Sequence, residues 1–310
     1  MPENRPQHNN RDNMRNRTQN SFAGSQNNRR PNHSQSEPQY TETGNLGLLY
    51  TRRYYDGLTS DMLILPSTNE REKKDIRKRQ NIYYRFRNRN LIEQSKRTDM
   101  FNNLPLPPSN VTFLLATSYP GLITGIGISH SSGHENEAKL GLAFDHTTGL
   151  PFIPGSSVKG LLRSVFPGPR KTNESERCDF IREKLGMPTL SNADIIRLGE
   201  IIFGSDNKDS QNHTQGCDIF HDAFPVEAIS GLLDLDYITP HTKGEFSAPN
   251  PIQFMRIKPG VTFRFSFILH PTRLSDSATI SPSDKEKLFK HILTTVGIGA
   301  KTNVGYGQLK

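Results

Sequence analysis

The chain has 310 residues, a formal net charge of +8 and 33% hydrophobic residues. The positive charge favours polyanionic partners, nucleic acid above all, and the low apolar content predicts that part of the chain has no packed core. The two cysteines form no CxxC pair, which argues against a zinc site and against a secreted disulfide scaffold. No stretch is apolar enough to span a membrane. We therefore expect a cytoplasmic protein without a metal or other cofactor.

Residues 1–42 are rich in Asn, Gln, Ser and Arg and contain hardly any apolar side chains. Such a segment cannot bury enough surface to offset the conformational entropy lost on ordering, which predicts a disordered, basic tail. The tail is either a solvated leader without a function of its own or a weak electrostatic tether for RNA.

Residues 43–108 are predicted to form a helical extension. Its main helix spans about 68–94, where apolar side chains recur at roughly helical intervals: Ile76, Ile82, Tyr83, Phe86 and Ile92. The other faces of this helix would carry the cations Arg77, Lys78, Arg79, Arg85, Arg87 and Arg89. A charge run of this kind usually marks a solvated face, although arginines interleaved with aromatic residues also suit RNA. The proline-rich stretch 104–110 is expected to be a connector.

Apolar and β-branched residues become frequent after this connector, and we assign residues 109–310 to one domain. One or two strands are expected over 111–129. They precede a helix that begins after Pro154-Gly155 and that either Ser156 or Ser157 caps.

The second half of the domain alternates polar and apolar segments. Residues 168–215 are interpreted as a polar insertion with a helix over 191–204. Residues 217–225 begin as a buried strand, and residues 245–270 are interpreted as a strand pair that turns at Lys258-Pro259-Gly260.

A last helix follows, with Ser283 as its N-cap and Glu286 as the reciprocal partner, before a glycine-rich loop and a short terminal strand. The ordered part thus reads strand, helix, strands, helix, strand. This order predicts an α+β fold: an RRM-like or ferredoxin-like antiparallel sheet with helices on one face.

The terminal loop is the first candidate binding site, because "GIGAKTNVGYG" combines four glycines with a lysine, a threonine and an asparagine. Glycine lets a backbone approach a ligand closely, so exposed N–H groups between Gly297 and Lys301 would hold phosphate oxygens, and the side chains that follow would donate to phosphate or a 2′-hydroxyl. The alternative is a structural loop whose glycines permit tight packing against the first helix of the domain. The residues assigned to this site are Gly297, Gly299, Lys301, Thr302, Asn303 and Gly305.

The stretch "GSSVKG" is the second candidate. Ser156, Ser157 and the first N–H groups of the helix would form a phosphate site, with Lys159 and Arg163 four residues apart on one face. The alternative is ordinary serine capping with cations that face solvent.

Three motifs in this order resemble the RAMP superfamily, the repeat-associated proteins of CRISPR effector complexes. They are "GLPFIPGSSVKGLLRSVF" around the first helix, the middle segments "IIFGS", "DIFHDAFP" and "PNPIQFMRIKPGVTFRFSF", and the terminal "GIGAKTNVGYG". Within the superfamily, the set is similar to the sixth RAMP subunits of Cmr-type, type III-B, complexes. The resemblance covers about residues 45–310.

The resemblance implies a non-catalytic RNA-binding structural subunit that caps a stack of neighbouring RAMP subunits of the Cmr complex and acts in antiviral defence. Its RNA partners would be the spacer-derived 3′ part of the CRISPR RNA and the target RNA paired with it. Base pairing would then supply sequence specificity, and the protein would read backbone and shape.

Members of this family insert a hairpin between guide bases, and the resemblance places it at residues 233–251, with His241 and Lys243 as RNA contacts. The segment is too polar and proline-rich to be predicted as a core strand, and the alternative is a surface loop that packs on a neighbouring subunit. Arg256, a further candidate contact, alternates with Met255 and Ile257 and is expected to leave the buried face of its strand.

Two other classes of function stay open at this point. A metal-independent ribonuclease that processes CRISPR RNA would use the same fold, with His130, His134 or Lys301 as acid–base groups. A scaffold that does not touch RNA is the other possibility. Specific cleavage of repeat RNA in EDTA would indicate the enzyme.

Overall fold

The structure, a computed structural model, describes residues 44–63, 69–125, 132, 134, 136–139, 141–168, 172–205, 214–239, 251–275 and 278–310. The predicted tail, residues 1–42, lies outside them. Thr43–Lys310 form one compact unit, which contains both the predicted extension and the predicted domain.

The main sheet is built around β6 (Val261–Ile268). Strand β1 (Val111–Ala116) pairs with one edge of β6, and β2 (Ile219–Phe220) and β3 (Phe224–Ala228) pair with the other, all antiparallel. Alternate side chains of β6 point to opposite faces, so its phenylalanines enter the core while Arg264 leaves it. Two backbone hydrogen bonds of 2.9 Å between Ala116 and Lys310 place the end of the chain beside β1.

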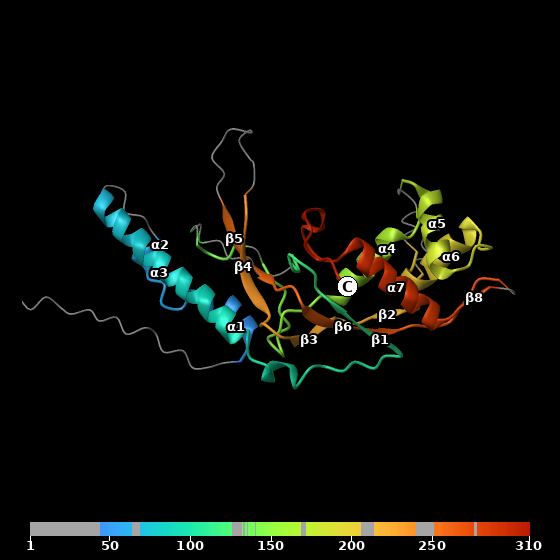
Figure 1. Ribbon diagram of the computed structural model, residues 1–310, viewed down its shortest axis with the longest axis horizontal. Helices are drawn as coiled ribbons and strands as arrows, with labels where there is room; N and C mark the ends of the chain where they lie inside the picture. Colours follow the sequence, from blue (N-terminus) through green and yellow to red (C-terminus); the bar gives the residue numbers. More distant parts are fainter. Residues whose placement is uncertain are drawn as a thin grey trace, which may run out of the picture. The chain divides into compact units, whose positions relative to one another are not determined.

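Two helices, α4 (Gly155–Val165) and α7 (Pro282–Val296), cover one face of this sheet (Figure 1). The ring of Phe289 on α7 lies 5.7 Å from that of Phe267 on β6, centroid to centroid, and both are buried. Burial of such aromatic side chains is the main driving force for this packing. The predicted mixed fold, an antiparallel sheet with helices on one face, is confirmed. The ferredoxin-like arrangement stays a prediction, since the strand at one edge is divided into β2 and β3.

The start of α7 differs from the predicted one. Ser281 caps the helix by accepting from the Asp284 N–H, and the Asp284 carboxylate accepts from the Ser281 N–H in return. Pro282 is the first helical residue, a position where its missing N–H costs nothing. The N-cap therefore lies two residues before the predicted cap Ser283.

The segment predicted as a polar insertion contributes two helices to the core. Helix α6 (Asn192–Phe203) was expected, and its capping box joins Ser191 and Asp194. Helix α5 (Glu174–Leu185) was not expected, because charged residues surround its two fully buried side chains, Cys178 and Ile181. Helices α5 and α6 contact each other, and α5 also packs on α7. The insertion over residues 168–215 stays a prediction, and the structure adds α5 to the one helix expected within it.

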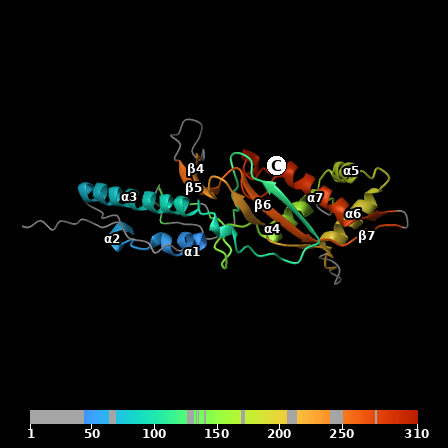
Figure 2. The same ribbon diagram turned by 60° about the horizontal axis from the view of Figure 1, so that its bottom comes forward.

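The extension contains α1 (Leu46–Thr51), a 3-10 turn η1 (Arg53–Tyr55), α2 (Ser60–Leu63), α3 (Glu70–Gln94) and a second 3-10 turn η2 (Asp99–Phe101). Figure 2 shows α1 and α3 side by side, in agreement with their contacts. The long helix is confirmed.

The buried face of α3 differs from the predicted one. Ile82 is 62% exposed, whereas Tyr84 and Arg87 are buried. The guanidinium of Arg87 lies 5.0 Å from the Tyr83 ring centroid and donates to the Asp56 carbonyl, and burial lowers its pKa to about 10. Tyrosines and hydrogen-bonded polar groups fix this face, which an apolar pattern alone does not reveal.

Strands β4 (Leu233–Ile238) and β5 (Ile252–Ile257) form a separate antiparallel pair. The segment from residue 233, which was not expected to be a core strand, begins with β4, and only Leu233 of its six residues is buried. Strands β5 and β6 do not pair with each other, because the turn at Lys258–Gly260 leads from one sheet into the other. A third, two-stranded sheet joins β7 (Thr272–Arg273) and β8 (Thr279–Ile280).

The proline-rich connector lies on the face of the main sheet opposite α4 and α7 (Figure 1). It has no helix or strand between residues 104 and 110, as predicted. Arg264 donates to the Pro105 carbonyl at 2.6 Å, and the His221 ring lies 3.0 Å from the Pro108 carbonyl. These bonds hold the connector against the sheet.

Candidate nucleic-acid interface

A groove of about 360 Å³ brings the two candidate motifs together, although they are far apart in the sequence. One wall is the α4 helix, with Ser157 and Leu161. The other wall is the end of α7 and the glycine-rich loop that follows it. The remaining lining residues are Thr124, Gly125, Val296, Gly297, Ile298, Gly299, Ala300 and Thr302.

The glycines of the loop hold it against residues 121–123. Gly299 has a φ of 98°, and a Cβ atom there would lie 2.3 Å from the Ile123 carbonyl oxygen. Gly297 has a φ of 75° and would place a Cβ 2.9 Å from the Gly307 oxygen. Positive φ and close backbone approach both require glycine at these positions. The tight packing predicted for this loop is therefore present, but against the segment after β1 and not against α4.

Two of the backbone N–H groups predicted to hold phosphate are used inside the protein. The Gly297 N–H donates to Leu293 at 3.1 Å, and the Ala300 N–H donates to Ile123 at 2.8 Å. The prediction that these two groups are exposed donors is wrong. The Gly297 N–H closes the last turn of α7, and the Ala300 N–H bonds the loop to the segment after β1. Gly299 itself is exposed at the mouth of the groove.

The polar residues of the loop lie at its outer side. Lys301 has a φ of 60° and precedes a short 3-10 turn, η3 (Thr302–Val304). Lys301 and Asn303 are exposed, whereas Thr302 is half-buried and lines the groove. Gly305, with a φ of 96°, closes the turn by donating to Thr302 at 3.0 Å. The loop thus presents one ammonium and one amide side chain to solvent beside the groove.

The start of α4 is closed by a carboxylate. Pro154 is the N-cap, and neither Ser156 nor Ser157 caps the helix, which corrects that prediction. The Asp222 carboxylate accepts from the Gly155 N–H at 2.6 Å, and the Ser157 N–H donates to Pro154 at 2.8 Å. A carboxylate placed there compensates the helix dipole as a phosphate would. Ser156 remains exposed, and Ser157 lines the groove.

Lys159 and Arg163 lie on a different face of α4 from Ser157. The Lys159 ammonium is 6.0 Å from the Phe220 ring centroid, and Arg163 donates to the Gly204 carbonyl at 3.3 Å. Residues two apart on a helix do not share a face. The predicted phosphate site is therefore divided, with the serine in the groove and both cations on the side of β2.

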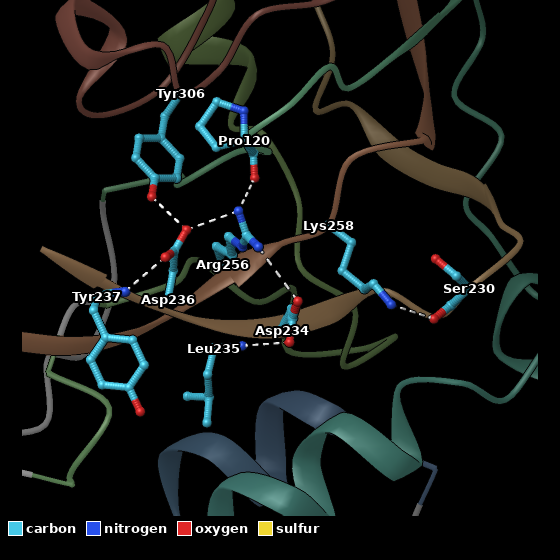
Figure 3. A network of polar contacts seen from close by, with 9 residues as sticks. All are labelled: Pro120, Ser230, Asp234, Leu235, Asp236, Tyr237, Arg256, Lys258 and Tyr306. Carbon is cyan, nitrogen blue, oxygen red and sulfur yellow. Dashed lines mark hydrogen bonds and ion pairs between the residues drawn. The ribbon is translucent and has the colours of Figure 1, made fainter.

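Arg256 is the centre of a polar network between the β4–β5 pair and the terminal loop (Figure 3). Its Nη1 lies 2.8 Å from the Asp236 carboxylate and donates to the Pro120 carbonyl, while Nη2 lies 3.5 Å from Asp234. The Tyr306 hydroxyl donates to the Asp236 carboxylate at 2.6 Å. Burial is the larger cause that raises the pKa of the Tyr306 phenol, and this hydrogen bond is the second. Arg256 leaves the buried face that Met255 and Ile257 share, as expected, and two carboxylates balance its charge.

The remaining candidates lie away from this network or outside the described residues. His241 and Lys243 lie outside them, as does His130. His134 stacks on Tyr84 of α3 with ring centroids 5.0 Å apart, so the extension holds it. His134 is not among the described residues that line the groove.

One cluster bears on the expectation of no metal. Potential ligand atoms of Cys217, Asp218 and His270 lie within 4.8 Å of one another. The Asp218 carboxylate is already engaged, since it pairs with Lys285 at 2.6 Å and accepts from the His270 N–H at 2.9 Å. The absence of a metal stays a prediction.

Comparison with known proteins identifies the family. Residues 115–310 match the model of the RAMP superfamily. The chain belongs to this superfamily. The match begins in the last two residues of β1 and takes in the groove, the Arg256 network and the terminal loop, and it leaves α3 outside. None of the helices in the described part of this RAMP chain is long and apolar enough to cross a membrane.

Two curated relatives and one solved structure are similar to this RAMP chain. "CRISPR system CMR subunit Cmr6" of Saccharolobus solfataricus is 30% identical over 266 residues, which cover 80% of this chain and 77% of the relative. "CRISPR system Cmr subunit Cmr6" of Pyrococcus furiosus is 25% identical over 233 residues, 59% of this chain and 64% of the relative. A chain in the "Cryo-EM structure of the Type III-B Cmr-beta bound to cognate target RNA" is 24% identical, with 85% and 84% covered and a TM-score of 0.47.

Proposed function

We propose that this chain is a non-catalytic RNA-binding subunit of a type III-B CRISPR effector complex. It caps the stack of RAMP subunits and holds the 3′, spacer-derived part of the CRISPR RNA and its duplex with target RNA, in antiviral defence. The two curated relatives, both named as Cmr6 subunits, support the assembly. Neighbouring RAMP subunits are its protein partners.

The observation that carries the RNA-binding role is the groove in which Ser157 of α4 faces the glycine-rich loop. Thr302 lines the groove with a hydroxyl, and the exposed Lys301 stands between the lining residues Ala300 and Thr302, a position that we call the rim. A hydroxyl and an ammonium suit phosphate and 2′-hydroxyl groups. The buried N–H groups of the loop give it a fixed shape, so little entropy is lost when RNA binds. Such contacts hold RNA without reading its bases.

A charge reversal at the rim tests this role. Lys301→Glu is expected to weaken binding of a guide-length single-stranded RNA by the full chain and to reduce the dependence of log K on log salt by about 0.7, the contribution of one phosphate contact on a single strand. Lys287→Glu, an exposed position on α7, makes the same charge change as a control. Equal loss in both variants would show that only the net charge matters and would overturn the assignment of the groove.

The absence of catalysis is tested separately. The purified chain is expected to leave CRISPR repeat RNA intact in EDTA over long incubation. Specific cleavage that His134→Ala abolishes would identify the chain as a ribonuclease instead.

A further inference from the structure

Helix α3 carries a stripe of cations along one side, which we call the α3 stripe: Arg71, Lys74, Lys78, Arg85 and Arg89. All five are exposed. At about 100° per residue, these positions fall within about 60° of one another around the helix axis, and at about 1.5 Å per residue they extend over about 27 Å. The helix has nine Lys and Arg against four Asp and Glu, so the stripe lies in a positive field.

The opposite side of α3 is the side that the protein buries. Ile76, Tyr84 and Leu91 are buried there, and the Tyr54 hydroxyl donates to Asn88 at 2.8 Å. The contacts of this side fix the rotation of the helix about its axis. The α3 stripe is therefore held toward solvent by the fold, and in Figures 1 and 2 the N-terminal half of α3 extends away from the main sheet.

Four of the five cations of the α3 stripe have no ion-pair partner among the described residues, whereas Arg89 interacts electrostatically with Glu93. Within the described part of the chain, no carboxylate lies within ion-pair distance of Arg71, Lys74, Lys78 or Arg85. Cations of α3 outside the stripe do form such pairs, since Lys73 lies 2.7 Å from Glu70 and Arg79 lies 3.7 Å from Asp75. The helix thus pairs charges elsewhere and leaves the first four cations of the stripe without a carboxylate partner.

Beside the first half of the stripe lies a groove of about 510 Å³. It is lined by Arg71, Lys74, Arg77 and Lys78 together with Asp75 and Asn81. Four cations therefore surround one open depression on the surface of α3, and the single carboxylate among its described lining residues is the one paired with Arg79. An anionic chain laid along the helix would meet cations at each turn of this half.

We propose that the α3 stripe is a second RNA-binding surface, which holds consecutive backbone phosphates of an RNA strand lying along the helix. It rests on the proposed function in that the chain binds RNA, but it uses residues outside the groove at α4. Polyanion binding requires cations spaced along a line and no apolar anchor. Stable protein interfaces have an apolar centre. Beside the α3 stripe, the exposed large apolar side chain on this helix is Ile82, which is 62% exposed. The charge therefore fits RNA better than an acidic protein.

Two double variants with the same charge change test the α3 stripe. Lys78→Glu with Arg85→Glu alters the stripe, and Lys184→Glu with Lys287→Glu alters exposed or partly exposed positions on α5 and α7. Binding of a guide-length single-stranded RNA and of an RNA duplex by the full chain is measured over a range of salt. The stripe variant is expected to lower affinity at least tenfold at low salt and to reduce the salt slope by about 1.4, the value for two phosphate contacts on a single strand. The control is expected to retain the slope.

The outcomes separate this inference from the proposed function. Loss of affinity in the stripe variant with none in Lys301→Glu supports the stripe and overturns the groove, and the reverse result overturns the stripe alone. Equal losses in both double variants also overturn the stripe, since only net charge would then matter. If the stripe variant binds RNA normally but no longer assembles with purified Cmr subunits, the surface serves a protein and the inference is wrong. Circular dichroism of each variant verifies that α3 remains helical.

Discussion

The ammonium of Lys285 on α7 lies 2.6 Å from the carboxylate of Asp218, and both side chains are completely buried. Lys285 also donates to the His270 carbonyl at 2.7 Å, and the His270 N–H donates back to Asp218 at 2.9 Å. This closed set of bonds ties the end of the segment before β2 to α7. Helix α7 in turn leads directly into the terminal loop of the groove.

Removing one partner of this pair should destabilise the protein strongly. Lys285→Met leaves the Asp218 carboxylate buried and unpaired, and we expect a loss of about 3–5 kcal/mol in the free energy of unfolding by urea. The double variant Lys285→Met with Asp218→Leu should lose less than Lys285→Met alone, because no buried charge remains. Additive losses would show that the two residues act independently.

Alkaline pH should destabilise the extension through its tyrosines. Burial raises the pKa of Tyr50 and Tyr54 above the ordinary value, and the nearby Glu137 carboxylate adds to the rise. The unfolded chain releases these protons near pH 10 and the folded chain keeps them, so the folded state binds more protons above that pH. The stabilisation is complete below about pH 10 and is lost as the pH rises toward the folded-state values.

Urea midpoints measured between about pH 8 and about pH 11 test this expectation. Tyr54→Phe should flatten the fall in stability at high pH. Tyr119→Phe should leave it unchanged, since Tyr119 is 81% exposed in the folded state. A fall that is equally steep in all three proteins would assign it to other groups.

Two glycines of α4 should respond in opposite directions to alanine. A Cβ at Gly160 would meet no atom within 4 Å, so Gly160→Ala should stabilise the protein by about 0.5–1 kcal/mol through helix propensity. A Cβ at Gly155 would lie 2.2 Å from the Phe220 carbonyl oxygen, so Gly155→Ala should cost about 1–3 kcal/mol. Thermal unfolding of both variants measures the two signs, and stabilisation by Gly155→Ala would contradict the close approach of α4 to β2.

Two glycines of the terminal loop separate backbone strain from collision. Gly299 and Gly305 have φ values of 98° and 96°, but a Cβ at Gly305 comes no nearer than 3.5 Å to another residue, at Pro120 Cδ. Gly305→Ala should therefore cost only the strain of about 1–2 kcal/mol. Gly299→Ala should cost about 1–3 kcal/mol more, because its Cβ would meet the Ile123 carbonyl. Urea unfolding compares them, and equal losses would mean that the loop relaxes away from residue 123.

Periodicity in the sequence predicted the long helices, but it could not show which residues from other segments pack against them. Helix α5 was missed because its inward residues are few and its charges dominate the pattern. The pairing of β4 with β5 was not predicted, because Asp234 and Asp236 are typical of loops and Arg256, which balances their charge, lies on the partner strand. The balancing group lies on another strand, so no local signal marks it.

The groove shows the same limit at the level of the site. Glycine and serine content marked both of its walls in the sequence. The sequence could not show which backbone N–H groups remain available to a ligand. The N–H groups of Gly155 and Ala300 are bonded to Asp222 and Ile123, which lie in distant parts of the chain. The separation of Lys159 from Ser157 follows from helix geometry and could have been predicted from their spacing.

The walls of the groove come from residues 124–125, 157–161 and 296–302, and contacts between such distant segments form late when a chain folds. During synthesis the last wall is also the last to be made. An incompletely folded chain therefore has the glycine and serine motifs but no groove between them. Under the proposed function, RNA added during refolding should bind in the groove only after the slowest folding phase.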